Sequence, residues 1–249
     1  MIPVFRKTRK KLADDNKPMK YLRYAIGEIL LVVIGILMAV QINQWNEARK
    51  ISNLELEIMA ELKKEVVSNR SSLEKLLVIR RESISVTDSL LALFHEDLIE
   101  NTVEELEALV AISVMGGFYT YDPNMGYLNS LISSGQINII SDKHLITLLT
   151  QFESKVTDSK EGTEMFRVFW AHQLGPVYAK YIRFTVPEAA HPKLKSHFPS
   201  NFSGFFSDPD VEYWMNHCNS WIAVNHPAQE NILTELDLMI SMIDKIVAK

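Results

Sequence analysis

The sequence AIGEILLVVIGILMAVQI at residues 25–42 decides which architecture the chain can adopt. Among these residues only Glu28 and Gln41 are strongly polar, and each lies near one end. As a helix the segment rises by about 27 Å, which matches the hydrocarbon core of a bilayer. A helix in the core of a soluble protein normally carries a polar stripe, and residues 29–40 provide none. We therefore predict one transmembrane helix, residues 24–44, through which the protein contacts the lipid bilayer.

A cleaved signal peptide also combines a basic leader with an apolar segment, so the residues that follow the segment matter. They read Ala39-Val-Gln-Ile-Asn43 and lack the small-x-small pattern of a signal peptidase site. The prediction is an uncleaved signal anchor.

Charge is distributed unevenly along the chain, whose formal net charge is −5. Residues 1–23 hold eight Lys or Arg and two Asp or Glu, a net +6, and the remainder has a net −11. Lys and Arg beside a span stay in the cytoplasm, so residues 1–23 are predicted to be a cytoplasmic leader and residues 45–249 to lie outside. The basic residues of the leader are Arg6, Lys7, Arg9, Lys10, Lys11, Lys17, Lys20 and Arg23.

Other residues in and around the span indicate which groups it contacts in the membrane and at its two interfaces. Tyr21 and Tyr24 on one flank and Trp45 on the other are placed as aromatic anchors at the two membrane interfaces. Glu28 is expected to reach the headgroups or to pair with a base such as Arg23, and a role inside the membrane is the less favoured interpretation. Gly35 and Ala39 would let a second copy approach closely, although one pair of small residues is weak evidence.

Beyond the span, apolar residues recur every three or four positions and predict a long amphipathic stalk helix that continues the membrane helix. Asn69 lies on this stripe, and Arg80 stands where the next apolar residue is due. The stripe therefore fits either an irregular coiled coil between two copies or a helix packed against its own chain. The apolar residues are Ile51, Leu54, Ile58, Leu62, Val66, Leu73, Leu76 and Leu77.

Capping residues and glycines predict where the next helices begin and end. A further helical stretch is expected over Ser89–Phe94. Another helix begins at Thr102, which fits a capping box with Glu105, and Gly116-Gly117 is expected to end it. Asn124 is a candidate cap for a helix that Gly135 ends, and Ser141 is expected to cap the one after it.

The C-terminal third also predicts helices. Pro176 is expected to bend or interrupt one of them. A loop from Pro187 to Pro209 is predicted to be held by Phe198, Phe202, Phe205 and Phe206, and either Asp208 or Asp210 opens the next helix. Pro227 suits the first position of the last helix. No run alternates in the manner of a strand, so the prediction is an all-α fold: a transmembrane helix, a stalk helix and an irregular bundle of roughly six to eight helices.

Two blocks, KYLRYAIGEILLVVIGILMAVQINQWNEARK at residues 20–50 and NMGYLNSLISSG at residues 124–135, are similar to a family of single-span, membrane-anchored proteins of Gram-negative bacteria. That family is described only as a domain of unknown function. The resemblance covers nearly the whole chain and is most specific at Tyr24–Glu47. It implies an inner-membrane protein with one span near its start and the bulk of the chain in the periplasm. It implies no activity, ligand or catalytic residue.

Candidate groups for catalysis or metal binding lie in the C-terminal third. His226 and Glu230 are four apart and would share a helical face, whereas His217 and Cys218 are adjacent and would point about 100° apart. No HExxH, CxxC or DxDxDG spacing occurs, and a single cysteine excludes an intramolecular disulfide. We expect no catalytic residue, cofactor or metal site, so the protein is not expected to be an enzyme. The remaining candidates are His172, His191, His197, Asp208, Asp210 and Glu212.

Nucleotide and nucleic-acid binding are disfavoured. The chain contains no GxxxxGK or GxGxxG, and the net −11 beyond the leader repels a polyanion. The basic leader is better explained by orientation and by anionic lipid headgroups. The aromatic residues of the outer part would either line a ligand pocket or, the preferred interpretation, belong to the core. They are Phe118, Tyr119, Tyr121, Trp170, Trp214 and Trp221.

Two functions from different classes remain. The first is a binding or scaffold module of the cell envelope that recognises a protein partner or a second copy of itself. The second is a ligand-sensing domain, which would need a separate cytoplasmic partner because residues 1–23 are too few to form an output domain. An enzyme of unrecognised type is the third and least favoured possibility.

Overall fold

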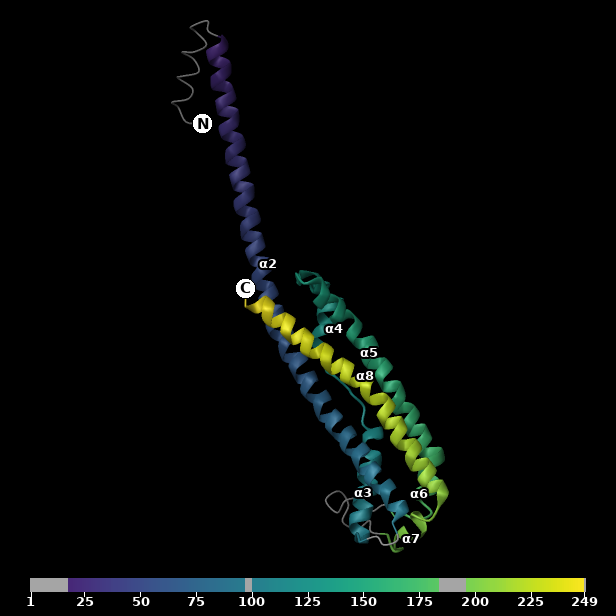
Figure 1. Cartoon of the computed structure of the whole chain (residues 1–249). Coiled ribbons are helices and arrows are strands. Elements are labelled where there is room, and N and C mark those ends of the chain that lie inside the picture. Colours follow the sequence, from purple (N-terminus) through teal and green to yellow (C-terminus); the bar gives the residue numbers. More distant parts are fainter. Residues whose placement is uncertain (1–17, 97–99, 184–195, 249) are drawn as a thin grey trace. The chain divides into compact units, whose positions relative to one another are not determined.

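The structure is a computed structural model that describes residues 18–96, 100–183 and 196–248, with the backbone alone for residues 18–21, 23 and 24. The chain divides into two compact units, residues 1–55 and 56–249. All regular structure in the described residues is helical, which confirms the predicted fold class (Figure 1).

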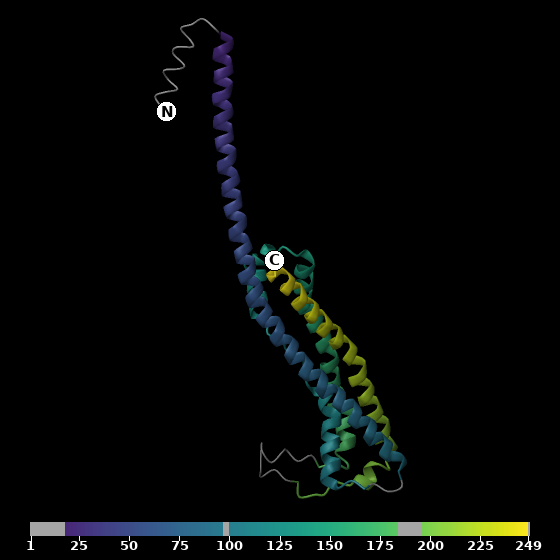
Figure 2. The same ribbon diagram turned by 60° about the vertical axis from the view of Figure 1, so that its left-hand side comes forward.

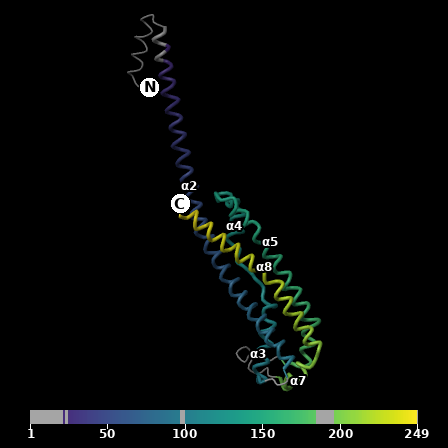
Figure 3. Tube along the Cα trace, in the orientation of Figure 1, coloured from purple at the N-terminus to yellow at the C-terminus, as the bar shows by residue number. Residues whose placement is uncertain are grey.

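The described part of the first unit belongs to helix α2 (Pro18–Ala92), whose trace is coloured purple to blue in Figure 3. Its apolar side chains are exposed, including Ile29 at 64% and Leu31 at 68%. By length and composition, this is one helix near the N-terminus that is long and apolar enough to cross a membrane, and its most apolar window is not buried. Burial therefore distinguishes it from the core helix of a soluble domain. The leader at residues 1–17 and the side chains of Tyr21, Arg23 and Tyr24 lie outside the described residues.

The second unit is a bundle in which the C-terminal part of α2, α5 (Lys143–Phe169) and α8 (Pro209–Val247) lie side by side (Figures 1 and 2). Helix α8 is antiparallel to α2, because Lys63 pairs with Asp244 and Arg70 with Asp237, both at 2.5 Å. The shorter helices are α3 (Val103–Phe118), α4 (Gly126–Ser133), α6 (Gly175–Tyr178) and α7 (Phe202–Phe205). Two 3₁₀ turns, Leu93–His95 and Gln136–Ile139, and a π-helical turn, Trp170–Leu174, complete the described elements.

The bundle has two apolar cores at successive levels along the long helices. The first core takes residues from the middle of α2, from α4, from the N-terminal part of α5 and from the C-terminal part of α8, among them Leu62, Leu73, Leu131, Leu149, Phe152 and Leu236. The second core takes residues from the end of α2, from α3, from the C-terminal end of α5, from α6 and α7, and from the N-terminal half of α8, among them Leu90, Val110, Phe166, Tyr178, Phe205 and Cys218.

From Ile58 onward the apolar stripe of the stalk faces this bundle, whereas Ile51 and Leu54 are 49% and 37% exposed. Leu62 and Leu73 are fully buried, and the two polar interruptions, Asn69 and Arg80, are only 4% and 2% exposed. Residues 56–92 of α2 therefore form a helix packed against their own chain, one of the two interpretations that the sequence left open.

The block at residues 124–135 docks onto α2 through polar contacts. The Asn69 side chain donates to the Asn124 carbonyl at 2.6 Å and accepts from the Asn124 amide at 2.8 Å. The Glu65 carboxylate accepts the amides of Tyr127 and Leu128 at 2.8 and 3.0 Å and so caps the first turn of α4. Gly135 follows the helix with a φ of 73°, as predicted for its end.

Two predicted boundaries near the middle of the chain are wrong, whereas the helical stretch expected over Ser89–Phe94 is confirmed. That stretch consists of the end of α2, which continues to Ala92 with Leu90 buried on the same stripe, and of the 3₁₀ turn that follows. Helix α3 starts with the predicted Thr102–Glu105 capping box but runs through Gly116-Gly117 to Phe118. These glycines permit close packing: a Cβ on Gly117 would overlap the Phe166 ring. Asp142, not Ser141, caps α5 by accepting the amides of His144 and Leu145 at 2.9 and 3.1 Å.

The C-terminal boundaries are also revised. Asp208 caps α8, which then runs through Pro227 to Val247, so the prediction that Pro227 starts a helix is wrong. Burial of Ile222 before the proline and of Ile232 after it outweighs the one backbone hydrogen bond that a proline removes. The α-helical pattern is interrupted just before Pro176, as expected. In the predicted loop Phe202, Phe205 and Phe206 are buried, whereas Phe198 is 71% exposed.

Candidate interaction surface on α5 and α8

The N-terminal half of α8 carries two stripes of apolar residues on different sides. Val211, Met215, Cys218 and Ile222 recur every three or four residues and are buried in the second core. A second series, which starts at Tyr213 and also recurs every three or four residues, remains at the surface. A helix with one buried face needs only the first stripe. The second stripe is therefore the feature that calls for an explanation.

The rings of the second stripe contact one another along the helix. Tyr213 stacks on His217 with 6.2 Å between centroids and 7° between planes, and it meets Trp214 edge-on at 4.8 Å. The Trp221 indole N–H donates to Nε2 of His217 at 3.1 Å. The contacts order large side chains at the surface, in advance of any binding event.

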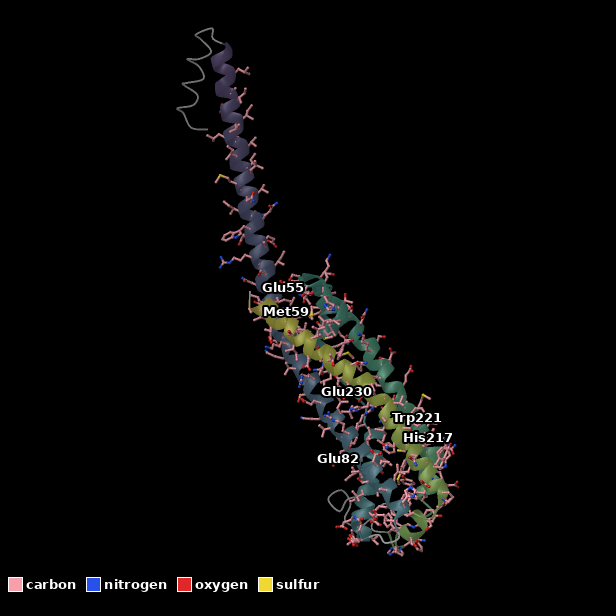
Figure 4. All side chains as sticks on the ribbon, viewed as in Figure 1. Glu55, Met59, Glu82, His217, Trp221 and Glu230 are labelled. Atoms are coloured by element: carbon pink, nitrogen blue, oxygen red, sulfur yellow. The ribbon has the colours of Figure 1, made fainter. Side chains whose placement is uncertain are left out.

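Helix α5 extends this surface. The ring of Phe169 contacts Trp214 at 5.5 Å and His217 at 5.3 Å between centroids. Met165 and Val168, on adjoining positions of α5, are 56% and 61% exposed. Figure 4 shows His217 and Trp221 on α8 at one edge of the bundle, with Glu82 of α2 on the other side. We refer to this surface as the aromatic face: Met165, Val168, Phe169, Tyr213, Trp214, His217, Trp221 and Val224.

Charges around the aromatic face are acidic. Asp210 lies one turn before Tyr213 on α8, Glu161 lies one turn before Met165 on α5, and both are exposed. Helix α8 contains no Lys or Arg from Pro209 to Asp244. The nearby cations of α5 are already paired, Lys160 with Asp122 at 2.7 Å and Arg167 with Glu164 on the same helix at 3.1 Å.

The only cysteine lies beneath the aromatic face. Cys218 is buried in the second core, and burial raises the pKa of its thiol to about 12. A thiol that is protonated at neutral pH is a poor nucleophile and a poor metal ligand. Its role in the structure is that of a small apolar residue.

The other candidate residues are dispersed. His172 and His197 are exposed, and His191 lies outside the described residues. His226 Nε2 lies 3.1 Å from a carboxylate oxygen of Glu230, as their spacing allowed. Asp208 caps α8 and accepts the Tyr181 hydroxyl at 2.7 Å. Within the described ranges no group of three or more His, Cys, Asp or Glu residues is arranged to hold a metal ion.

The preferred interpretation that the outer aromatics belong to the core holds for Tyr121, which is 2% exposed. It holds in part for Trp214 and Trp221, which are half-buried and pack against the second core, while their remaining surface contributes to the aromatic face. A signal was present in the sequence, because Tyr213, His217 and Trp221 repeat every four residues beside the buried stripe. Only the packing of α8 against α3, α5 and the other elements of the second core shows which of the two stripes faces inward.

Between the two cores the long helices contribute buried polar side chains. Arg80 donates through Nη2 to the Tyr119 carbonyl at 3.3 Å and to the Thr163 hydroxyl at 3.1 Å. No carboxylate pairs with it among the described residues, and its Nε and the Oε1 of Gln229 are buried without a partner. Burial lowers the pKa of Arg80 to about 10. We refer to Arg80, Ser83, Thr87, Ser159, Thr163 and Gln229 as the polar layer.

Comparison with known families gives a match. Residues 28–157, slightly more than half of the chain, match a family of unknown function (DUF6090), and the chain belongs to this family. The matched segment includes most of α2, the docked α4 and the first half of α5, whereas the aromatic face lies beyond it. Neither curated proteins nor solved structures give a match.

Proposed function

We propose that this member of DUF6090 is a membrane-anchored binding module of the cell envelope whose aromatic face docks a protein partner. The observation that carries the proposal is the exposure of this face, with Val168, Tyr213 and Val224 at 61%, 60% and 76%. Clustered apolar side chains at a surface mark interaction sites, and Trp and Tyr dominate the binding energy of protein interfaces.

The proposal also includes a topology. Residues 24–44 span the inner membrane, residues 1–23 lie in the cytoplasm and residues 45–249 lie in the periplasm. The supporting observations are the apolar helix near the N-terminus and the change from a net +6 to a net −11 across it.

Reporter fusions after Lys249 test this topology. We expect an alkaline phosphatase fusion to be active, because that enzyme needs an oxidising compartment, and a fluorescent protein that matures only in the cytosol to stay dark. The opposite pattern, or recovery of the full chain in the soluble fraction after gentle lysis, would contradict the membrane placement.

Site-specific photo-crosslinking in membranes tests the binding function. A photoreactive residue at position 213 or 224 should form a discrete protein adduct, whereas the same residue at position 82, which is exposed on α2, should not. Tyr213→Ser should reduce the adduct formed from position 224 by at least ten-fold. The proposal fails if neither position of the face forms an adduct above the level of position 82.

The polar layer favours a second candidate, a ligand-sensing domain that acts through a separate cytoplasmic partner. A buried cation without a carboxylate is costly, and such elements can convert between two packings when the cost is relieved. A sensor needs the leader for its output, so shuffling the sequence of residues 1–23 at constant charge should abolish the cellular phenotype of the gene. An anchor that serves only to hold a binding module should tolerate the shuffled leader.

A further inference from the structure

We propose that the partner presents a basic segment, with Arg or Lys side chains that lie against the rings of the aromatic face. This inference rests on the proposed binding function and adds the chemistry of the partner to it.

The rings supply the first part of the argument. Tyr213 is 60% exposed although it stacks on His217 and meets Trp214 edge-on. A cation within about 6 Å of a Trp or Tyr centroid is attracted by the ring, and Arg makes this contact most often. The face therefore offers ordered rings to an incoming cation without a prior rearrangement of its side chains.

The carboxylates supply the second part. Asp210 and Glu161 are exposed at the border of the face, and no ion pair in the described part of the chain joins either of them to a base. A guanidinium that stacks on a ring can at the same time pair with a carboxylate, which favours Arg over an apolar residue.

The charge of the whole outer part supplies the third. Residues 45–249 carry a net −10, and a negative field of this kind steers basic partners and repels acidic ones. A second copy of the same face would bring two sets of carboxylates together, and an anionic lipid surface would be repelled in the same way. A basic segment of another protein fits both the rings and the charge.

Titration of the full chain in neutral detergent micelles tests the inference directly. The probe is a short amphipathic helical peptide with Arg on one face, and the control peptide has citrulline in place of every Arg. Tryptophan fluorescence should report binding of the Arg peptide, with the citrulline peptide at least about ten-fold weaker. Equal affinity of the two peptides would overturn the inference.

Variants assign the effect to this surface. Glu161→Gln combined with Asp210→Asn should weaken the Arg peptide several-fold at low salt and much less at high salt, and Tyr213→Ser should weaken it at both. The matched control, Glu82→Gln with Glu153→Gln, removes the same charge from exposed positions off the face and should leave the affinity unchanged. If the control pair weakens binding as much as the test pair, the attraction is non-specific and the inference is wrong.

The same variants separate this inference from the proposed function. If position 224 forms its adduct in membranes and Glu161→Gln with Asp210→Asn leaves the yield unchanged, the face binds a partner that is not basic. In that case the binding function stands and the inference fails. Absence of any adduct from the face removes the binding function itself, whatever the peptide does.

Discussion

The two cores of the bundle use different residues to solve the same packing problem. The first core is almost entirely aliphatic, with Tyr121 and Phe152 as its buried aromatic residues, and the second contains Phe166, Tyr178, Phe202, Phe205 and Phe206. Three ion pairs border the first core, Lys63–Asp244, Arg70–Asp237 and Lys155–Glu235. Beside the second core α8 contacts α2 through one described polar bond, Asn219 to Asp88 at 2.7 Å.

The difference shows at which level polar contacts close the surface of the bundle and at which level aromatic side chains remain exposed. At the level of the first core the borders of α8 carry charged pairs, and the docking of α4 through Asn69 and Glu65 closes the structure. At the level of the second core the aromatic residues continue through Phe169 and Trp214 to the surface. We infer that the first core serves the fold and that the second also supports a binding surface.

The largest expected effects come from truncating each core. Leu236→Ala in the first and Phe205→Ala in the second should lower the free energy of unfolding by about 2–5 and 3–5 kcal/mol, since both side chains are fully buried. Because α2, α5 and α8 pass through both cores, urea unfolding of either variant followed by circular dichroism should show a single transition. Two separate transitions would show that the cores fold independently.

A smaller loss is expected from Gly117→Ala. The added methyl group would overlap the ring of Phe166, which is 2% exposed and cannot move away, so overpacking of about 1–3 kcal/mol should exceed the gain of about 1 kcal/mol in helix propensity. Gly162→Ala is the control substitution and should cost less stability than Gly117→Ala. The Asn225 side chain that its methyl group meets is only half-buried. Equal stability of the Gly117 variant and the wild type in thermal unfolding would show that α3 can shift.

A substitution in the polar layer is expected to raise the free energy of unfolding, whereas the substitutions above lower it. The folded-state pKa of Arg80 is lowered to about 10, so the unfolded chain binds the proton more tightly and the penalty is present at every pH below about 10. As the pH rises through 10 this penalty should diminish. Arg80→Met removes the charge and should raise the free energy of unfolding at pH 7 by about 1 kcal/mol, net of two lost hydrogen bonds. A loss of stability in urea titrations would show that these bonds outweigh the buried charge.

The smallest changes in the free energy of unfolding are expected when the hydroxyl group is removed from either of the two buried tyrosines. The Tyr121 hydroxyl donates to the Asn69 carbonyl at 3.2 Å, whereas the Tyr178 hydroxyl is buried without a partner. Burial raises the pKa of both phenols, so both are neutral at pH 7. Tyr121→Phe should cost about 1 kcal/mol, and Tyr178→Phe should cost nothing or add slight stability. Equal losses, measured by urea unfolding, would indicate that Tyr178 has a hydrogen-bond partner in solution.

Local patterns in the chain were sufficient to predict the helical fold class, the apolar membrane-length helix, the capping box at Thr102 and the helix end at Gly135. Each of these depends on residues within a few positions of one another. The inward and outward stripes of α8 were not distinguished in this way, because both recur at the helical period. Whether a ring is core or surface depends on which neighbours pack against it, and those neighbours, among them α3 and α5, are distant in the sequence.

The features that only the tertiary structure decided also depend on contacts between residues that are distant in the sequence. Gly116-Gly117 and Pro227 are breakers in isolation, yet they lie inside helices because contacts with Phe166, Ile222 and Ile232 outweigh the local preference. Asn69 and Arg80 interrupt an apolar stripe on paper, and in the bundle they are buried because Asn124, Tyr119 and Thr163 supply their hydrogen bonds. Local propensities are worth about 1 kcal/mol, whereas burial of a large side chain is worth several, so packing overrides propensity wherever the two disagree.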